Sequence, residues 1–223
     1  MFTEKEMKSF ENKILNMDCL DFLKKCPDKY FSLILTDPPY GIGIDGSVGG
    51  GSKRGAVKNC KKCDWDNFIP SKDYFEQMMR VSKNQIIWGG NYFIENLTNS
   101  RCFICWYKRD GLPERTFADA ELAWTSFDRN AKVYNIRWDG FIRDSKEPKE
   151  LHPTQKPLKL FEKCLVDFSE ENDLVLDCFS GSGTTAIACH RLKRRFICIE
   201  KDKDYYEASV KRLEDEKKQL TLF

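Results

Sequence analysis

A short segment of the N-terminal half combines a carboxylate, a rigid turn and an aromatic ring. An apolar, strand-like run at residues 31–36 is followed by Asp37, Pro38, Pro39 and Tyr40. Proline has a fixed φ and no N–H, so the carbonyls of this turn stay free to accept hydrogen bonds from a ligand. A flat base with an exocyclic amine could stack on Tyr40 and donate to Asp37 and the Pro38 carbonyl. Alone the segment is weak evidence, because two prolines after a strand more often form a plain turn.

A second motif has the pattern of a strand, a tight turn and a helix start. Residues 174–177 form an apolar run that ends in Asp177, and the turn after it contains Cys178, Phe179, Ser180, Gly181, Ser182, Gly183, Thr184 and Thr185. Glycine lets a ligand approach the backbone, and a helix N-terminus offers unpaired N–H groups. The turn lacks the Gly-Lys-Ser/Thr ending of a phosphate-binding loop and the third glycine of the dinucleotide fingerprint. Neither of those two ligand classes is therefore favoured.

An acidic residue ends the next predicted strand. Residues 195–199 are strand-like, and Glu200 follows them. In doubly wound folds a carboxylate at this place accepts hydrogen bonds from ribose hydroxyls. Taken alone, Glu200 would more often be a solvent-exposed strand end.

With these motifs in this order, the chain resembles the amino-group DNA methyltransferases that use S-adenosylmethionine. The resemblance is to the beta group, in which the catalytic tetrad precedes the cofactor turn. The matching segments are Asp37 to Tyr40, His152-Pro153-Thr154-Gln155-Lys156-Pro157, Asp177 to Thr185, and Glu200. The resemblance runs from about Asp18 to Leu213 and is weakest over residues 41–66 and 108–150. It implies a Rossmann-like methyltransferase fold, a mostly parallel, doubly wound α/β sheet with an antiparallel edge, in permuted order.

The resemblance also implies roles for individual residues. The catalytic residues would be Asp37, Pro38, Pro39 and Tyr40. The residues expected to bind the cofactor are Asp18, Cys19, Asp37, Gln155, Lys156, Asp177, Phe179, Gly181, Ser182, Gly183, Thr184, Thr185 and Glu200. Residues 108–150 are expected to hold the elements that read the DNA sequence. Candidate DNA contacts, here and in the basic segment before them, are Lys53, Arg54, Lys58, Arg109, Arg115 and Arg143, although an arginine on a loop is usually just solvated.

The expected chemistry follows from the weak nucleophilicity of an amine attached to an aromatic ring. Hydrogen bonds from that amine to Asp37 and Pro38 would return electron density to nitrogen, and stacking of a flipped-out base on Tyr40 would position it for direct attack on the methyl group. No covalent enzyme intermediate and no metal are needed. Adenine N6 is the preferred acceptor, because an Asp at the head of the tetrad goes more often with adenine in the resembled family and a Ser with cytosine N4.

Three alternatives to adenine methylation stay open. The nearest is an N4-cytosine DNA methyltransferase. An RNA or protein nitrogen methyltransferase would more often carry Asn in place of Asp37, and a nonenzymatic cofactor-binding regulator would be expected to lose Asp37 or Tyr40.

Length and composition fit a single domain spanning residues 1–223. The formal net charge of +2 does not by itself indicate DNA binding. The sequence contains no apolar run of about 18 residues, and its start is too charged for a signal peptide. We therefore expect a cytoplasmic protein with no membrane partner, and the resemblance implies double-stranded DNA as its partner. The sequence does not decide whether the chain forms a homodimer or works with a restriction endonuclease.

The ten cysteines permit a rival interpretation. Cys60 and Cys63 together with Cys102 and Cys105 resemble a four-thiolate zinc site. Residues 101–107, however, have the pattern of a strand, which would send Cys102 and Cys105 to opposite faces. We expect no metal, and we expect most cysteines to be small buried apolar residues. Residues 41–66 are rich in glycine and lysine without periodicity, which predicts a mobile loop beside the active site, with a flexible surface insertion as the open alternative.

The remaining elements follow from periodicity and capping residues. Helices are expected after Asp18, after Ser71, over residues 158–168 and after Asp202. Strands are expected at residues 85–88, 102–107, 121–127 and 132–138, with the last three forming the antiparallel edge of the sheet.

Overall fold

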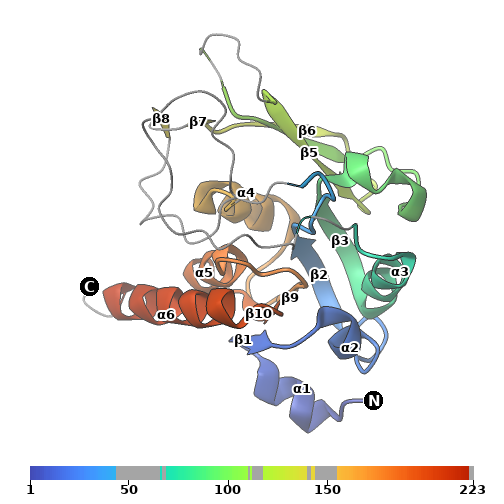
Figure 1. Ribbon diagram of the computed structural model, residues 1–223, viewed down its shortest axis with the longest axis vertical. Helices are drawn as coiled ribbons and strands as arrows, with labels where there is room; N and C mark the ends of the chain where they lie inside the picture. The colour runs from blue at the N-terminus through green and yellow to red at the C-terminus, as the bar shows by residue number, and fades with distance from the viewer. Residues whose placement is uncertain are drawn as a thin grey trace.

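The computed structural model describes residues 1–43, 66, 69–109, 111, 118–139, 142–143 and 155–220. Within these residues, the centre of the protein is an eight-stranded sheet with helices on both faces (Figure 1). From one edge to the other its strands are β1 (Lys13–Asn16), β10 (Arg195–Glu200), β9 (Leu174–Asp177), β2 (Phe31–Thr36), β3 (Ser82–Trp88), β5 (Ala120–Thr125), β4 (Phe103–Tyr107) and β6 (Lys132–Asn135). A separate hairpin pairs β7 (Trp138–Asp139) with β8 (Ile142–Arg143).

The central sheet is mostly parallel, with antiparallel pairing confined to one side. The strands β1, β10, β9, β2 and β3 pair in parallel, whereas β5 runs antiparallel to its neighbours β3 and β4. This confirms the predicted α/β sheet with an antiparallel edge. The strand predicted at residues 132–138 is wrong in length, because β6 ends at Asn135 and Trp138 pairs instead with Arg143 in the small hairpin. β6 itself runs parallel to β4, so the prediction that all three of these strands form an antiparallel edge is wrong in part: only β5 runs against the rest of the sheet.

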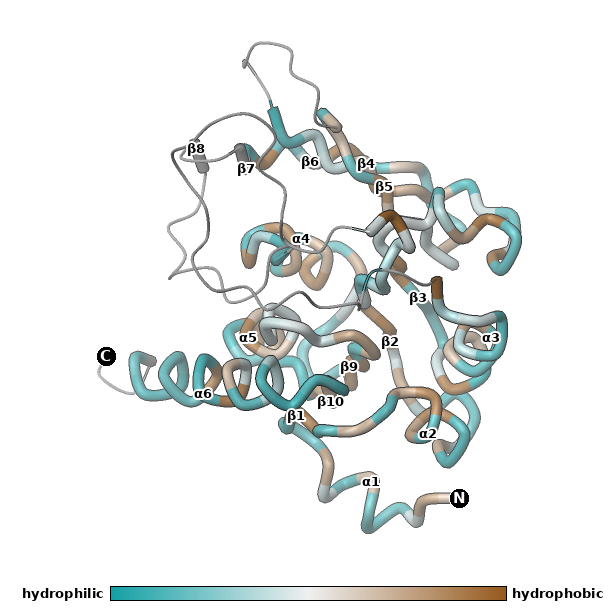
Figure 2. Tube along the Cα trace, in the orientation of Figure 1, coloured by the Kyte–Doolittle hydropathy of each residue, from teal (hydrophilic) through white to brown (hydrophobic). Residues whose placement is uncertain are grey.

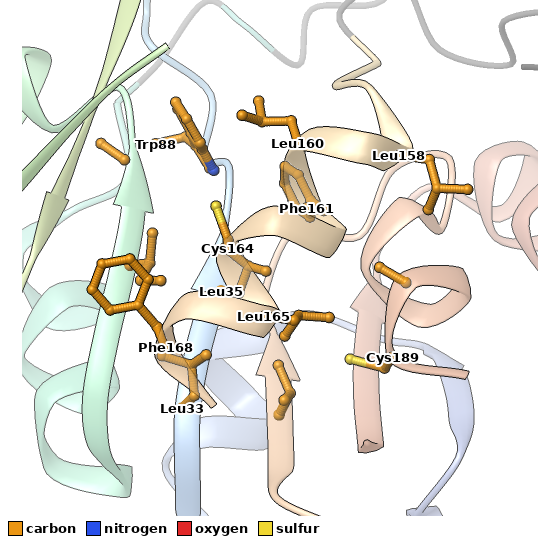
Figure 3. Close-up of a cluster of buried hydrophobic side chains, with 14 of the residues drawn as sticks. Leu33, Leu35, Trp88, Leu158, Leu160, Phe161, Cys164, Leu165, Phe168 and Cys189 are labelled. Atoms are coloured by element: carbon orange, nitrogen blue, oxygen red, sulfur yellow. The ribbon is translucent and has the colours of Figure 1, made fainter. Parts of the chain in front are cut away.

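Helices cover both faces of the sheet, as in a doubly wound fold. One face carries α4 (Leu158–Phe168), α5 (Thr184–Arg191) and α6 (Lys203–Leu220), and the other carries α1 (Glu4–Phe10), α2 (Cys19–Leu23) and α3 (Lys72–Val81). On the first face, Phe161 stacks on Trp88 with ring centroids 6.5 Å apart, in the same cluster as Leu33 and Leu35 (Figure 3). Because helices pack on both sides, the middle strands are apolar on both faces.

Short polar residues begin two of the helices, as the sequence predicts. Asp18 caps α2 by accepting a hydrogen bond from the Leu20 N–H at 2.9 Å, and Asp202 accepts one from the Tyr205 N–H at 3.0 Å at the start of α6. Ser71 occupies the capping position of α3, but its side chain makes no capping hydrogen bond. Figure 2 shows that α6 is mostly hydrophilic, in agreement with a helix that buries Leu213 against the core and turns charged residues to solvent.

The topology brings the two sequence motifs together. β2 and β9 are neighbours in the sheet, with Leu33 opposite Val175. Asp37 follows β2 directly and the glycine turn follows β9, so both motifs lie at the carboxyl edge of the parallel strands, where ligands bind in such sheets. β2, which leads into the tetrad, precedes β9, which leads into the glycine turn, and this is the permuted order predicted. In the part of the chain that the structure describes, no helix combines the length and apolarity needed to cross a membrane.

Two short 3-10 helices follow β3 and complete this edge. They are η2 (Gly90–Tyr92) and η3 (Ile94–Asn96). Gly89, just before them, adopts φ +69°, a left-handed conformation that favours glycine. This turn places Tyr92 beside Tyr40 of the tetrad.

Candidate active site

A large pocket opens where β2, β9 and β10 end. Its volume is about 1460 Å³. Its walls include the tetrad Asp37 to Tyr40, most of the glycine turn, Glu200, and the residues just before α4, Gln155 and Lys156. Both predicted motifs therefore face one cavity, large enough for a nucleoside-sized ligand and a base together.

Asp37 is held by two donors at the floor of this pocket. Its Oδ1 accepts a hydrogen bond from the Tyr40 hydroxyl at 2.6 Å, and its Oδ2 accepts one from the Lys156 ammonium at 2.6 Å. Lys156 also lies 3.1 Å from the Tyr40 oxygen. Burial raises the pKa of Asp37, and the charge and hydrogen bond of Lys156 oppose that shift. In the same way burial works against the charged form of Lys156, but Asp37 and Glu121 raise its pKa well above the ordinary value.

The ring of Tyr40 packs closely against the turn after β3. The ring stacks on Tyr92 with centroids 4.8 Å apart and an interplanar angle of 15°. A Cβ added at Gly89 would lie 2.2 Å from Cε1 of Tyr40, so only glycine fits there. The backbone of the tetrad is fixed by Asp66, whose Oδ1 accepts from the N–H groups of Tyr40 at 2.7 Å and Gly41 at 3.1 Å. A base that stacks on the face covered by Tyr92 must therefore displace that ring.

Asp177 ties the glycine turn to the neighbouring strand. Its Oδ1 accepts a hydrogen bond from the Thr36 hydroxyl at 2.8 Å and one from the Phe179 N–H at 3.1 Å, and its Oδ2 accepts one from the Thr185 hydroxyl. Burial raises the pKa of Asp177 to about 6, against the effect of these hydrogen bonds. The carboxylate thus joins β2, the turn and the first residues of α5, and gives the pocket a fixed wall.

Glu200 braces the other side of the same turn. Its Oε2 accepts from the Gly181 N–H at 2.7 Å and its Oε1 accepts from the Asp202 N–H at 2.8 Å. Burial raises the pKa of Glu200 to about 7. A carboxylate oxygen has a second lone pair, so each oxygen can also accept a hydroxyl that enters the pocket. Glu200 is therefore not the bare strand end that its position alone suggests.

The other predicted cofactor residues lie around this cavity with one exception. Asp18 accepts from the Tyr74 hydroxyl at 3.2 Å and from the Lys201 ammonium at 3.0 Å, next to Cys19 at the start of α2. The cavity wall contains Asp18, Cys19, Gln155, Phe179, Gly181, Ser182, Thr184 and Thr185. Gly183 is not part of the wall. It caps α5 with φ +79° and packs on Ser209, because an added Cβ would lie 3.1 Å from the Ser209 Cβ.

Sequence reasoning missed three contributors to this site, Glu121, Asp66 and Tyr92. Glu121 is the charged residue of β5, and its Oε1 accepts a hydrogen bond from Lys108 at 2.8 Å while its Oε2 lies 3.2 Å from the Lys156 ammonium. Burial disfavours the charged form of Glu121, yet Lys156 and Lys108 lower its pKa to about 2. A charge inside an otherwise apolar strand is the sequence signal that could have pointed to it.

The candidate DNA contacts are placed less completely. Lys53, Arg54, Lys58 and Arg115 lie outside the described residues, as does most of the loop predicted at residues 41–66. Arg109 is 3% exposed and forms an ion pair with Asp119 at 3.4 Å, so its guanidinium is not open to a phosphate in this conformation. The backbone of Arg143 lies in β8, and its side chain is outside the described part.

The cysteines of the rival zinc site are only partly described. Cys60 and Cys63 lie outside the described residues. Cys102 is buried just before β4 and Cys105 is half-buried within it, on the opposite side of the strand, as the alternation predicts. Among the residues that the structure describes, no three His, Cys, Asp or Glu side chains are grouped so that they could hold a metal ion.

Comparison with known proteins identifies the class to which this site belongs. Residues 81–211, more than half of the chain, match the model of a family described as DNA methylase, which covers N6 and N4 enzymes. The chain belongs to this family and is an amino-group DNA methyltransferase.

Individual relatives match over nearly the whole chain. The chain is 29% identical to the type II methyltransferase M2.DpnII of Streptococcus pneumoniae, over 94% of this chain and 93% of that protein. Among solved structures, M1.HpyAVI in complex with S-adenosylmethionine is 26% identical, with a TM-score of 0.57 over 90% of this chain and 99% of that one. The cytosine-N4-specific PvuII DNA methyltransferase has the same fold, with 18% identity and a TM-score of 0.59 over 91% of this chain and 90% of that one. The fold alone therefore does not choose between adenine and cytosine.

Proposed function

We propose that this protein transfers a methyl group from S-adenosylmethionine to N6 of adenine at specific sites in double-stranded DNA. The observation that carries the proposal is the placement of Asp37 and Tyr40 in the same pocket as the glycine turn and Glu200. An acceptor site and a nucleoside site then share one cavity, as direct transfer between two bound molecules requires. The relatives named type II methyltransferases support a site-specific activity within a restriction–modification system.

The residues of the glycine turn fit the methyl donor. Gly181 keeps the backbone open beside Glu200, whose oxygens can accept ribose hydroxyls while they hold the turn. Asp18 and Phe179 line the same side of the cavity and offer a polar and an aromatic surface. When bound, S-adenosylmethionine supplies a methyl group that is reactive because its sulfur carries a positive charge.

The tetrad binds the acceptor base and activates its amine. Asp37 and the Pro38 carbonyl accept the N–H groups of the base amine, which raises the electron density on nitrogen and orients its lone pair. Tyr40 provides the ring on which an extruded base stacks. Asp66 keeps the turn rigid through the Tyr40 and Gly41 amides, so the acceptor groups are set before the base arrives.

Adenine is favoured over cytosine by the Asp at the head of the tetrad. Cytosine N4 is the second candidate, because the PvuII enzyme has the same fold and is cytosine-N4-specific. Both bases present an exocyclic amine that can donate a hydrogen bond to Asp37, so chemistry alone permits either one.

One experiment separates these possibilities. Purified protein is incubated with bacterial genomic DNA and isotopically labelled S-adenosylmethionine, and the hydrolysed nucleosides are separated by mass spectrometry. Labelled N6-methyladenine supports the proposal, and Asp37→Ala should remove it. Labelled N4-methylcytosine alone would move the acceptor to cytosine. No labelled nucleoside from a protein that binds the cofactor would reject the proposed function.

A further inference from the structure

The acceptor carboxylate of this site is already in use in the free protein. Both oxygens of Asp37 accept hydrogen bonds, one from the Tyr40 hydroxyl and one from the Lys156 ammonium, each at 2.6 Å. Lys156 is almost fully buried, with 7% of its side chain exposed. An ammonium held this close offsets the negative charge of the ionised carboxylate. A carboxylate paired in this way returns less electron density to an incoming amine. Lys156 must therefore give up this contact, at least in part, before transfer.

A second carboxylate, that of Glu121, lies next to Lys156 and can accept a hydrogen bond from its ammonium in place of Asp37. Oε2 of Glu121 lies 3.2 Å from the Lys156 nitrogen. This oxygen is buried and accepts no hydrogen bond from the residues that the structure describes. Oε1 of the same carboxylate is anchored by Lys108, and the backbone of Glu121 pairs with Trp106 in the sheet, so the acceptor is held in place. A small rotation of the lysine head would complete the hydrogen bond that Oε2 lacks.

We infer that Lys156 alternates between Asp37 and Glu121, and that Glu121 is a positioning residue for methyl transfer. The inference rests on the proposed function. In the free protein Lys156 holds Asp37. When the base amine enters, Lys156 donates to Glu121 instead and leaves Asp37 to the amine. The lysine stays paired in both states, which matters because an unpaired buried ammonium is strongly unfavourable.

The surrounding charges explain why such a pair is useful. Asp37 is faced by Tyr40 on its own turn, by Lys156 before α4, by Glu121 on β5 and by Asp177 at the end of β9. Burial, Glu121 and Asp177 favour the protonated form of Asp37, and a protonated carboxyl accepts hydrogen bonds poorly. Lys156 is the nearby cation that keeps it ionised, while Lys108 holds Glu121. Sharing Lys156 between two carboxylates keeps Asp37 charged without blocking it permanently.

The test uses a double-mutant cycle on the full-length protein. Single-turnover methylation of double-stranded DNA is measured from acid to alkaline pH for wild type, Glu121→Gln, Lys156→Met and the double variant. Glu170→Gln removes the same charge from an exposed position and serves as the matched control. Calorimetry with S-adenosylmethionine, together with thermal melting, checks that each variant folds and binds the cofactor.

The inference predicts a distinctive pattern. Glu121→Gln should lower the rate at least about fivefold at all pH values, because Lys156 then stays on Asp37. In the double variant this loss should disappear at pH values above the acid limb, since no lysine remains to block the carboxylate. Lys156→Met should move the acid limb of the rate profile to higher pH, because Asp37 loses the cation that favours its charged form.

Several outcomes would overturn the inference. One is a Glu121→Gln protein as active as Glu170→Gln, and another is a double variant as slow as Glu121→Gln alone. If Glu121→Gln does not fold, Lys156→Met decides by itself, and an unmoved acid limb rejects the idea. A wild-type protein that methylates no DNA would instead reject the proposed function, so the two failures are distinguishable.

Discussion

Gly89 offers a quantitative test of how Tyr40 is positioned. Replacing it by alanine has two separable effects. The backbone is at φ +69°, where any residue with a Cβ is strained by about 1–2 kcal/mol. In addition, the new Cβ would lie 2.2 Å from Cε1 and 2.7 Å from Cδ1 of Tyr40. The backbone cannot easily retreat, because the Gly89 N–H donates to the Leu122 carbonyl at 2.8 Å.

Gly111 provides the matched control. It has φ +75°, nearly the same conformation, but among the residues that the structure describes nothing lies within 4 Å of a Cβ built there. Gly111→Ala should therefore cost only the conformational strain. Gly89→Ala should cost that strain plus about 1–3 kcal/mol for crowding against Tyr40, the usual range for overpacking.

Two assays measure the difference. Urea denaturation gives the free energy of unfolding of each variant, and single-turnover methylation gives the effect on the site. We expect Gly89→Ala to be the less stable of the two and to lose most activity, because Tyr40 has to move. Gly111→Ala should lose less activity, because it does not touch Tyr40. Equal stability and equal activity of the two variants would refute the packing of Tyr40 on Gly89.

Four further predictions follow from the same site. Asp37→Ala should abolish methyl transfer in a protein that still folds, because Lys156 keeps Glu121 as a partner; near wild-type turnover would refute the mechanism. Glu200→Ala should weaken S-adenosylmethionine binding by about 1.5–3 kcal/mol in calorimetry if its carboxylate holds the ribose, and an unchanged affinity would assign Glu200 to the turn alone. The pKa of Glu200 rises from 4.5 to about 7 on folding, so its contribution to stability is lost as pH increases through that window, by at most about 3 kcal/mol. Wild type should therefore lose stability between pH 5 and 8 relative to Glu200→Gln. Parallel curves of unfolding free energy against pH for the two proteins would contradict the shift. The glycine-rich segment carries a basic cluster made of Lys53, Arg54, Lys58, Lys61 and Lys62. Replacing these five residues by Ser should reduce the salt dependence of DNA affinity, measured by titration at several salt concentrations. An unchanged dependence of log affinity on log salt concentration would show that these residues do not contact DNA.

Most of the strands, turns and helix starts that carry this site were predictable from local sequence. Asp37 and Asp177 each follow a buried apolar run, and the carboxyl ends of parallel strands meet at one edge of the sheet. The roles that the resemblance implies for Asp37, in catalysis and in cofactor binding, likewise place the tetrad beside the cofactor turn. Asp18 and Asp202 were likewise identifiable as helix caps, because capping depends on residues that are close in the chain.

Contacts across the sheet could not be predicted in this way. Lys156 was expected in the cofactor pocket, and it does line the cavity, but its ammonium binds the Asp37 carboxylate. Arg109 was a candidate DNA contact, but it is buried beside Asp119. Both outcomes depend on the direction in which a long side chain leaves its backbone, and nothing in the neighbouring sequence sets that direction.

The sequence by itself determined the class of protein, the strands and turns that carry its motifs, and the edge of the sheet where they meet. The tertiary structure decided which charges meet there. Glu121 reaches Lys156 because β5 lies two strands away from β2, and Asp66 reaches the Tyr40 amide from the far end of a long segment. Such pairings depend on strand order and on distances between segments remote in the chain, so they arise only when the whole fold closes around the pocket.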